Sequence, residues 1–156
     1  MNYPRIKFIN TNPNITSENF QRIVSIWRKQ EDYIMPKIVK ESGLTFSEKE
    51  IVIEIVDNIK GGTSNPFRIS SKIPNDKVIN LITHELIHRI LTFNTEWKTH
   101  NDFIRGKYID ESDLVRIHIV VNTILKDVLP PEKVQKDIAW ATGHYKRAWN
   151  LVNDTM

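Results

Sequence analysis

The segment "LITHELIHRI", residues 81–90, places two histidines and a glutamate among aliphatic side chains. His84 and His88 are four residues apart, so on a helix they lie one turn apart on the same face. Glu85 is adjacent in angle, and its carboxylate can reach a water on a metal without ligating the metal itself. In this H-E-x-x-H arrangement two imidazoles bind Zn²⁺ and the glutamate is the general base. The segment therefore predicts a Zn²⁺ cofactor held by His84 and His88, with Glu85 as a catalytic residue.

The competing interpretation is that both histidines border the core and are satisfied by hydrogen bonds, with a surface glutamate between them. Burying an imidazole without a partner costs free energy, which favours a metal. The chain has no cysteine, so disulfides and thiolate ligands are excluded. Any metal must be held by histidine, aspartate, glutamate or water.

The histidine pair needs a helix to bring its side chains to one face. Residues 76–93 have the apolar pattern of such a helix, and they follow Pro74, which breaks the preceding chain. Asn75 or Asp76 is expected to cap it.

A second buried helix is predicted over residues 110–129, beginning at Asp110 or Ser112 and ended by two prolines. Residues 131–154 are predicted to form a final helical segment, with a break near Gly143.

The segments before the histidine pair predict a small sheet. Residues 50–60 alternate between isoleucine on one face and other side chains on the opposite face, which indicates a strand stopped by the glycines at 61–62. Residues 67–73 are short and polar enough to form an edge strand.

One further helix is predicted over residues 16–43, kinked near Pro36 and ended by Gly43. Residues 1–15 are rich in asparagine and proline and predict an extended lead-in. Residues 94–109 predict a polar connection.

Together these elements indicate an α+β fold: a single domain over residues 1–156, in which a minor sheet of about two or three strands packs on the two buried helices. A chain of this length can bury one real core but not two.

Composition narrows the class of protein. Hydrophobic residues make up 40% and charged residues 26%, which is ordinary for a soluble domain. The net charge of +3 is spread along the chain, with no basic run that would predict nucleic-acid binding. No apolar run is long enough to span a membrane, and the N-terminus lacks a secretory signal, so we expect a cytoplasmic protein.

The pattern around "HELIH" resembles the zincin metallopeptidases over roughly residues 50–128, although only the "HELIH" piece is highly specific. In zincins the strand before the metal helix binds substrate along its exposed edge, and a later helix supplies a third metal ligand. The resemblance therefore implies a peptide or protein substrate and a ligand in the second buried helix.

His118 is the preferred third ligand. It lies among isoleucine and valine side chains, where an imidazole requires a metal or a hydrogen-bond partner. In the gluzincin branch and the compact IrrE-like proteins, the third ligand is a glutamate, followed four residues later by an aspartate or asparagine that supports the first motif histidine. His118 occupies the place of that glutamate, and Asn122 occupies the place of the supporting residue.

Two other residues remain candidates for the third ligand. Glu111 lies seven residues before His118, on nearly the same helical face, but it can equally cap the helix or hydrogen-bond a ligating imidazole. His100 in "WKTHNDFI" is similar to the loop histidine of SprT-like proteases, with Phe103 as its aromatic neighbour. Its polar surroundings also fit an exposed loop.

Zincins often stabilise the oxyanion with a tyrosine or histidine from outside the metal helix. Tyr145 is the candidate we prefer for this catalytic role, with His144 beside it and Tyr108 as a further possibility. The competing interpretation is that "GHYKRAW" simply starts an amphipathic helix. Trp140 and Trp149 are expected to be core contacts.

The sequence thus predicts a zinc-dependent hydrolase, most concretely a metallopeptidase with His84, His88 and His118 on the metal and Glu85 as base. The alternatives are a zinc-bound regulatory or interaction module without efficient turnover, and a helical binding protein without metal. A latent form, with the C-terminal helix filling the cleft, is also compatible with the sequence.

Overall fold

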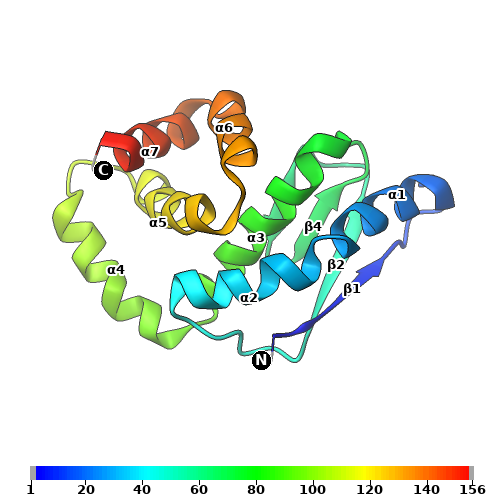
Figure 1. Cartoon of the computed structure of the whole chain (residues 1–156), viewed down its shortest axis with the longest axis horizontal. Helices are drawn as coiled ribbons and strands as arrows, with labels where there is room; N and C mark the ends of the chain where they lie inside the picture. The colour runs from blue at the N-terminus through cyan, green and yellow to red at the C-terminus, as the bar shows by residue number, and fades with distance from the viewer. Residues whose placement is uncertain (1–2, 155–156) are drawn as a thin grey trace.

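A computed structural model describes residues 3–154, with the side chains of residues 95–96 and 98–100 left out of the description. Within these residues the chain forms a small four-stranded sheet and seven α-helices, which confirms the predicted α+β class (Figure 1). The strands are β1 (Arg5–Ile9), β2 (Glu50–Val56), β3 (Gly62–Ser64) and β4 (Phe67–Ser70). The helices are α1 (Ser17–Arg28), α2 (Glu31–Ser42), α3 (Val78–Thr92), α4 (Thr95–Lys107), α5 (Asp113–Val128), α6 (Pro131–Trp140) and α7 (Gly143–Asp154).

The sheet has the order β1-β2-β4-β3. The pairs β1–β2 and β2–β4 are parallel, whereas β3 runs antiparallel to β4 and occupies the edge. The alternating isoleucines of β2 are fully buried, while Val52 between them is 39% exposed. One face of the sheet therefore packs into the core, and α1, α2 and α3 lie on that side in Figure 1.

The sheet is larger than the sequence predicts. The expected lead-in over residues 1–15 contains β1, where Ile6 pairs in register with Ile51 and is fully buried. The glycines at 61–62 do not simply stop a strand, because Gly62 begins β3. The strand predicted over residues 67–73 forms as β4, but its predicted edge position is wrong, because β4 lies inside the sheet and β3 takes the edge.

The helix predicted over residues 16–43 is two helices, and the break lies at residues 29–30 rather than near Pro36. Pro36 stays inside α2 because buried residues on both sides of it, Met35 and Ile38, hold that helix to the core. The polar connection predicted over residues 94–109 is also wrong in part, since it contains α4.

The two helices that the sequence predicts around the histidines are confirmed. α3 is preceded by a 3₁₀ turn over Asn75–Lys77, and its N-cap residue Lys77 makes no side-chain capping bond, so neither Asn75 nor Asp76 caps it as expected. α5 begins after Ser112, whose hydroxyl accepts a hydrogen bond from the Val115 amide. α5 packs against α2, α3 and α7, and this places it at the centre of the helical layer.

The last two helices are joined through Gly143, which has a φ of 55° that favours glycine. Asp137 of α6 connects three helices: its carboxylate accepts hydrogen bonds from Asn80 Nδ2 of α3 at 3.3 Å and from Trp149 Nε1 of α7 at 3.0 Å. Trp149 is 1% exposed, as expected of a core contact. None of the helices within residues 3–154 combines the length and the apolar character that crossing a bilayer requires.

Burial raises the pKa of the Asp137 carboxyl above its ordinary value, against the opposing effect of its two hydrogen-bond donors. The folded state then binds this proton more tightly than the unfolded state, so the stabilisation from Asp137 is complete at acidic pH and declines as pH rises through the folded pKa. We expect Asp137→Asn to lose more stability relative to the natural chain at pH 4 than at pH 7. Urea unfolding at both pH values measures this, and a loss that grows with pH would contradict it.

Candidate metal centre

Helix α3 presents the two motif histidines because its other faces are buried. Ile82, Leu86 and Ile90 pack into the core, so the register of the helix is fixed. His84 and His88 remain partly exposed on the face that looks toward α5 and α7.

His118 comes from the middle of α5 and is 4% exposed. Its Nδ1–H donates to the Leu114 carbonyl at 2.7 Å, one turn earlier in the same helix. A neutral imidazole that donates through Nδ1 has its lone pair on Nε2. The contact therefore prepares Nε2 of His118 as a ligand atom, in the way that outer partners orient metal-binding histidines.

The three imidazoles converge on one point. His88 Nε2 lies 3.1 Å from His84 Nε2 and 3.1 Å from His118 Nε2, and ligand atoms of all three lie within 4.8 Å of one another. A single His88 N–H can point at only one of its two neighbours, so proton sharing leaves one contact unsatisfied. Three nitrogens bound to one tetrahedral zinc ion would be about 3.4 Å apart. The donor set and its spacing therefore fit a divalent metal ion, and these three histidines could bind one.

Burial also keeps these three imidazoles neutral, which is the form that binds a metal. It lowers the pKa of His84 well below its ordinary value, with a further contribution from the two neighbouring imidazoles. It lowers the pKa of His88 to about 4, again helped by His118. For His118 burial lowers the pKa, although the Leu114 carbonyl opposes this by stabilising the protonated ring. Neutral imidazoles are the ligating species.

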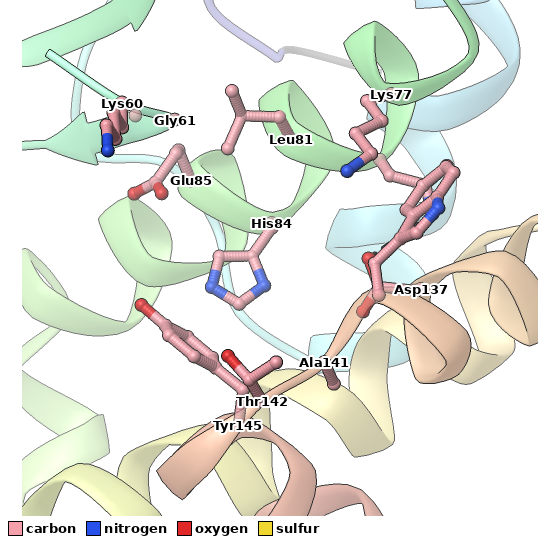
Figure 2. A pocket seen from close by; sticks show the side chains of 13 residues that line it. Lys60, Gly61, Lys77, Leu81, His84, Glu85, Asp137, Ala141, Thr142 and Tyr145 are labelled. Carbon is pink, nitrogen blue, oxygen red and sulfur yellow. Dashed lines mark hydrogen bonds between the residues drawn. The ribbon is translucent and has the colours of Figure 1, made fainter. Parts of the chain in front are cut away.

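Glu85 lies beside the three histidines, at 8% exposure. Burial raises the pKa of its carboxyl to about 7. The side chain faces a cleft of about 520 Å³ that is also lined by His84, Leu81 and Tyr145 (Figure 2). Glu85 is absent from the group of converging ligand atoms among the described residues, which agrees with a role next to a metal rather than on it.

The edge strand β3 runs directly past Glu85. A Cβ added at Gly62 would lie 3.1 Å from the Arg68 carbonyl oxygen and 3.2 Å from both Glu85 Cγ and Leu81 Cδ1. Arg89 of α3 fastens the other end of the strand, since its Nη1 donates to the Ser64 carbonyl at 2.6 Å. The strand thus forms one wall of the cleft because a glycine lets it approach the helix.

Tyr145, at the start of α7, closes the site from the opposite side. Its ring centroid lies 4.4 Å from that of His118 and 6.0 Å from that of His84. Figure 2 shows its hydroxyl turned toward Glu85, and burial together with the Glu85 charge raises the pKa of that hydroxyl. The neighbouring His144 has its ring centroid 5.3 Å from that of His118.

The structure distinguishes between the candidates for a third ligand. His118 joins the two motif histidines, whereas Glu111 lies outside the cluster and accepts hydrogen bonds from Arg147 of α7, with Nε at 3.0 Å. The side chain of His100 lies outside the described residues. Asn122 is 1% exposed and its Nδ2 has no hydrogen-bond partner among the described residues, so the predicted support of His84 by Asn122 stays a prediction.

Several cleft residues were missed by reasoning from the sequence. Trp140 was expected in the core, but it lines the cleft, and the Lys77 ammonium lies over its ring at 4.5 Å from the centroid. Lys60 and Thr142 also line the cleft. No spacing rule could have found them, because they come from a loop and from two different helix ends that only the tertiary fold brings together.

No protein-family model matches this chain, and no curated protein or solved structure matches it significantly. The metal centre therefore has to be judged on its own geometry.

Loading the purified chain with Zn²⁺ or Co²⁺ should give about one bound ion per chain and raise its melting temperature, because the ion binds only the folded state. His118→Ala should weaken that affinity by more than about 100-fold, since even outer partners of a metal ligand contribute 10- to 100-fold. Glu111→Gln is the control and should bind as the natural chain does. Isothermal titration measures both, and equal affinity for the His118→Ala protein would contradict the assignment.

Gly62→Ala should destabilise the fold by roughly 1–3 kcal/mol, because the new methyl group forces β3 away from Arg68, Leu81 and Glu85. Gly106→Ala is the matched control: it lies in α4 with nothing within 4 Å of the added Cβ, so we expect it to be neutral or to stabilise by about 0.5–1 kcal/mol. Urea unfolding of the two variants tests the close approach. A Gly62→Ala protein as stable as the control would show that β3 does not pack closely against α3.

Proposed function

We propose that this chain is a zinc-dependent hydrolase that cleaves peptide bonds, with His84, His88 and His118 as the metal ligands. The convergence of three imidazoles, of which His84 lines a cleft beside Glu85, carries this proposal. Three nitrogen ligands from two helices make up the donor set of a hydrolytic zinc site, which leaves a fourth position for water. The resemblance of "HELIH" to the zincin motif supports the same function.

A zinc ion held by these ligands would supply a Lewis acid that lowers the pKa of water toward about 7 and polarises the scissile carbonyl. Glu85, beside the ligands and facing the cleft, takes a proton from the attacking water and passes it to the leaving amine. Tyr145 reaches the site from the opposite wall, where its hydroxyl donates a hydrogen bond to the oxyanion that develops on the carbonyl.

An extended peptide suits this cleft better than a compact substrate does. β3 is the edge of the sheet, and an edge strand can pair with an added strand. Because Gly62 lies against Glu85, a peptide paired with β3 passes the general base. The remaining wall, with Trp140 and Tyr145, supplies aromatic surface for side chains of the substrate.

A second function, a zinc-bound interaction module without turnover, is favoured by one observation. The His144 ring lies next to His118, so a turn of its side chain toward the cluster would place a fourth imidazole near the metal. Four protein ligands close a zinc site and leave no position for the water. The two functions differ in what they require of Glu85.

Glu85→Gln should retain zinc and lower kcat for peptide hydrolysis by at least about 100-fold, because it removes the base without removing a ligand. A mixed peptide library analysed by mass spectrometry provides the substrate, and metal analysis of the same samples provides the control. If the natural chain with one bound zinc leaves every peptide intact, as Glu85→Gln does, the hydrolase proposal fails and the interaction module is favoured.

A further inference from the structure

The cleft that His84 and Glu85 line has a second pocket next to it, on the other side of Leu81. This second pocket of about 320 Å³ shares four lining residues with the cleft, Lys60, Gly61, Lys77 and Leu81. The shared residues place the two cavities next to each other at the start of α3. The second pocket is otherwise lined by Ile59 and by four residues at and just after the end of β4: Ser70, Lys72, Ile73 and Pro74.

The second pocket is basic. Lys60, Lys72 and Lys77 line it, and no acidic side chain does. These lysines come from three separate places in the chain: the loop after β2, the segment after β4 and the 3₁₀ turn before α3. None of the three forms an ion pair among the residues that the structure describes. Three lysines around one cavity, without an ion pair within the described part of the chain, attract an anion.

The charged groups near the second pocket do not cancel the attraction of its three lysines for an anion. Asp137 lines the first cavity and partly balances Lys77, but its carboxylate already accepts hydrogen bonds from Asn80 and Trp149. Lys77 also lies over the Trp140 ring, a contact that holds its ammonium at the junction of the two cavities. Figure 2 shows Lys60 and Lys77 on either side of Leu81.

The spacing relates this pocket to the bond that would be cut. Lys77 precedes Glu85 by eight residues, which is about 12 Å along a helix. An extended peptide advances about 3.3 Å per residue, so this distance corresponds to about four residues. The lysine side chain can reach part of the way back toward the metal, which brings the range to two to four residues.

We propose that the basic pocket binds a carboxylate of the substrate, two to four residues from the scissile bond, and thereby selects acidic peptides for hydrolysis. This inference rests on the proposed peptidase function, because it assumes that a peptide bound in the cleft extends into the neighbouring pocket. The carboxylate is either an aspartate or glutamate side chain or the free C-terminus of the peptide. Both sources present the same planar anion to the three lysines.

Binding to the full-length, zinc-loaded Glu85→Gln protein tests the pocket without turnover. The probes are acetylated and amidated octapeptides of alanine, serine and glutamine that carry one glutamate at each position in turn. The same peptide with glutamine throughout is the neutral reference, and its free-acid form presents only a C-terminal carboxylate. Titration calorimetry gives each affinity at low and high NaCl.

We expect at least one glutamate position, or the free-acid form, to bind about tenfold more tightly than the neutral peptide, with the advantage shrinking as salt is raised. Replacing Lys60, Lys72 and Lys77 together by glutamine should abolish the advantage. The matched control replaces Lys7, Lys29 and Lys49, exposed lysines that line neither cavity, and should preserve it. Equal affinity for acidic and neutral peptides, or an advantage that survives the loss of the three pocket lysines, overturns the proposal.

Hydrolysis by the natural chain separates this inference from the proposed function. If acidic peptides bind with the expected preference but are not cleaved, the carboxylate pocket stands and the peptidase fails. If peptides are cleaved without regard to charge, the peptidase stands and the carboxylate pocket fails.

Discussion

Three imidazoles share one small volume, and a proton cannot satisfy all of their facing lone pairs. His118 is committed through Nδ1 to its own helix, so it presents a lone pair to His88. A bound cation would relieve this crowding, and the fold holds the three imidazoles in place. The packing of α3 against α5 holds the ligands together, and the core residues on the far faces of both helices prevent either from rotating away.

The same helix pair determines where chemistry is possible. One face of α3 is closed by α5 and α7, another is buried against the sheet, and the remaining side opens into the cleft beside β3. Glu85 is found at this opening because it is one residue beyond His84 and therefore about 100° further around the helix. Helical geometry alone thus separates Glu85 from the two histidines of α3, while Gly62 sets how near the strand can come to Glu85.

Local pattern was a good guide to the metal centre and a poor guide to its surroundings. The spacing of His84 and His88 and the apolar run around His118 predicted two helices, because helical periodicity is a local property, and the histidines of these helices do lie together. β1 and β3 were missed since each is short and depends on pairing with a distant strand. The kink expected at Pro36 did not occur because burial of its neighbours outweighs one lost backbone hydrogen bond. The basic cavity was invisible for the same reason, since Lys60, Lys72 and Lys77 become neighbours only in the folded chain.

The three histidines that could bind a metal lie between residues 84 and 118, whereas one wall of the cleft, with Trp140, Thr142 and Tyr145, comes from the last two helices and their connection. The histidine cluster and this one wall of the cleft therefore depend on different stretches of the chain. Variation in the exposed side chains of the final stretch can alter what enters the cleft while the ligand shell stays unchanged. A fold divided in this way permits new preferences to evolve on an inherited metal centre.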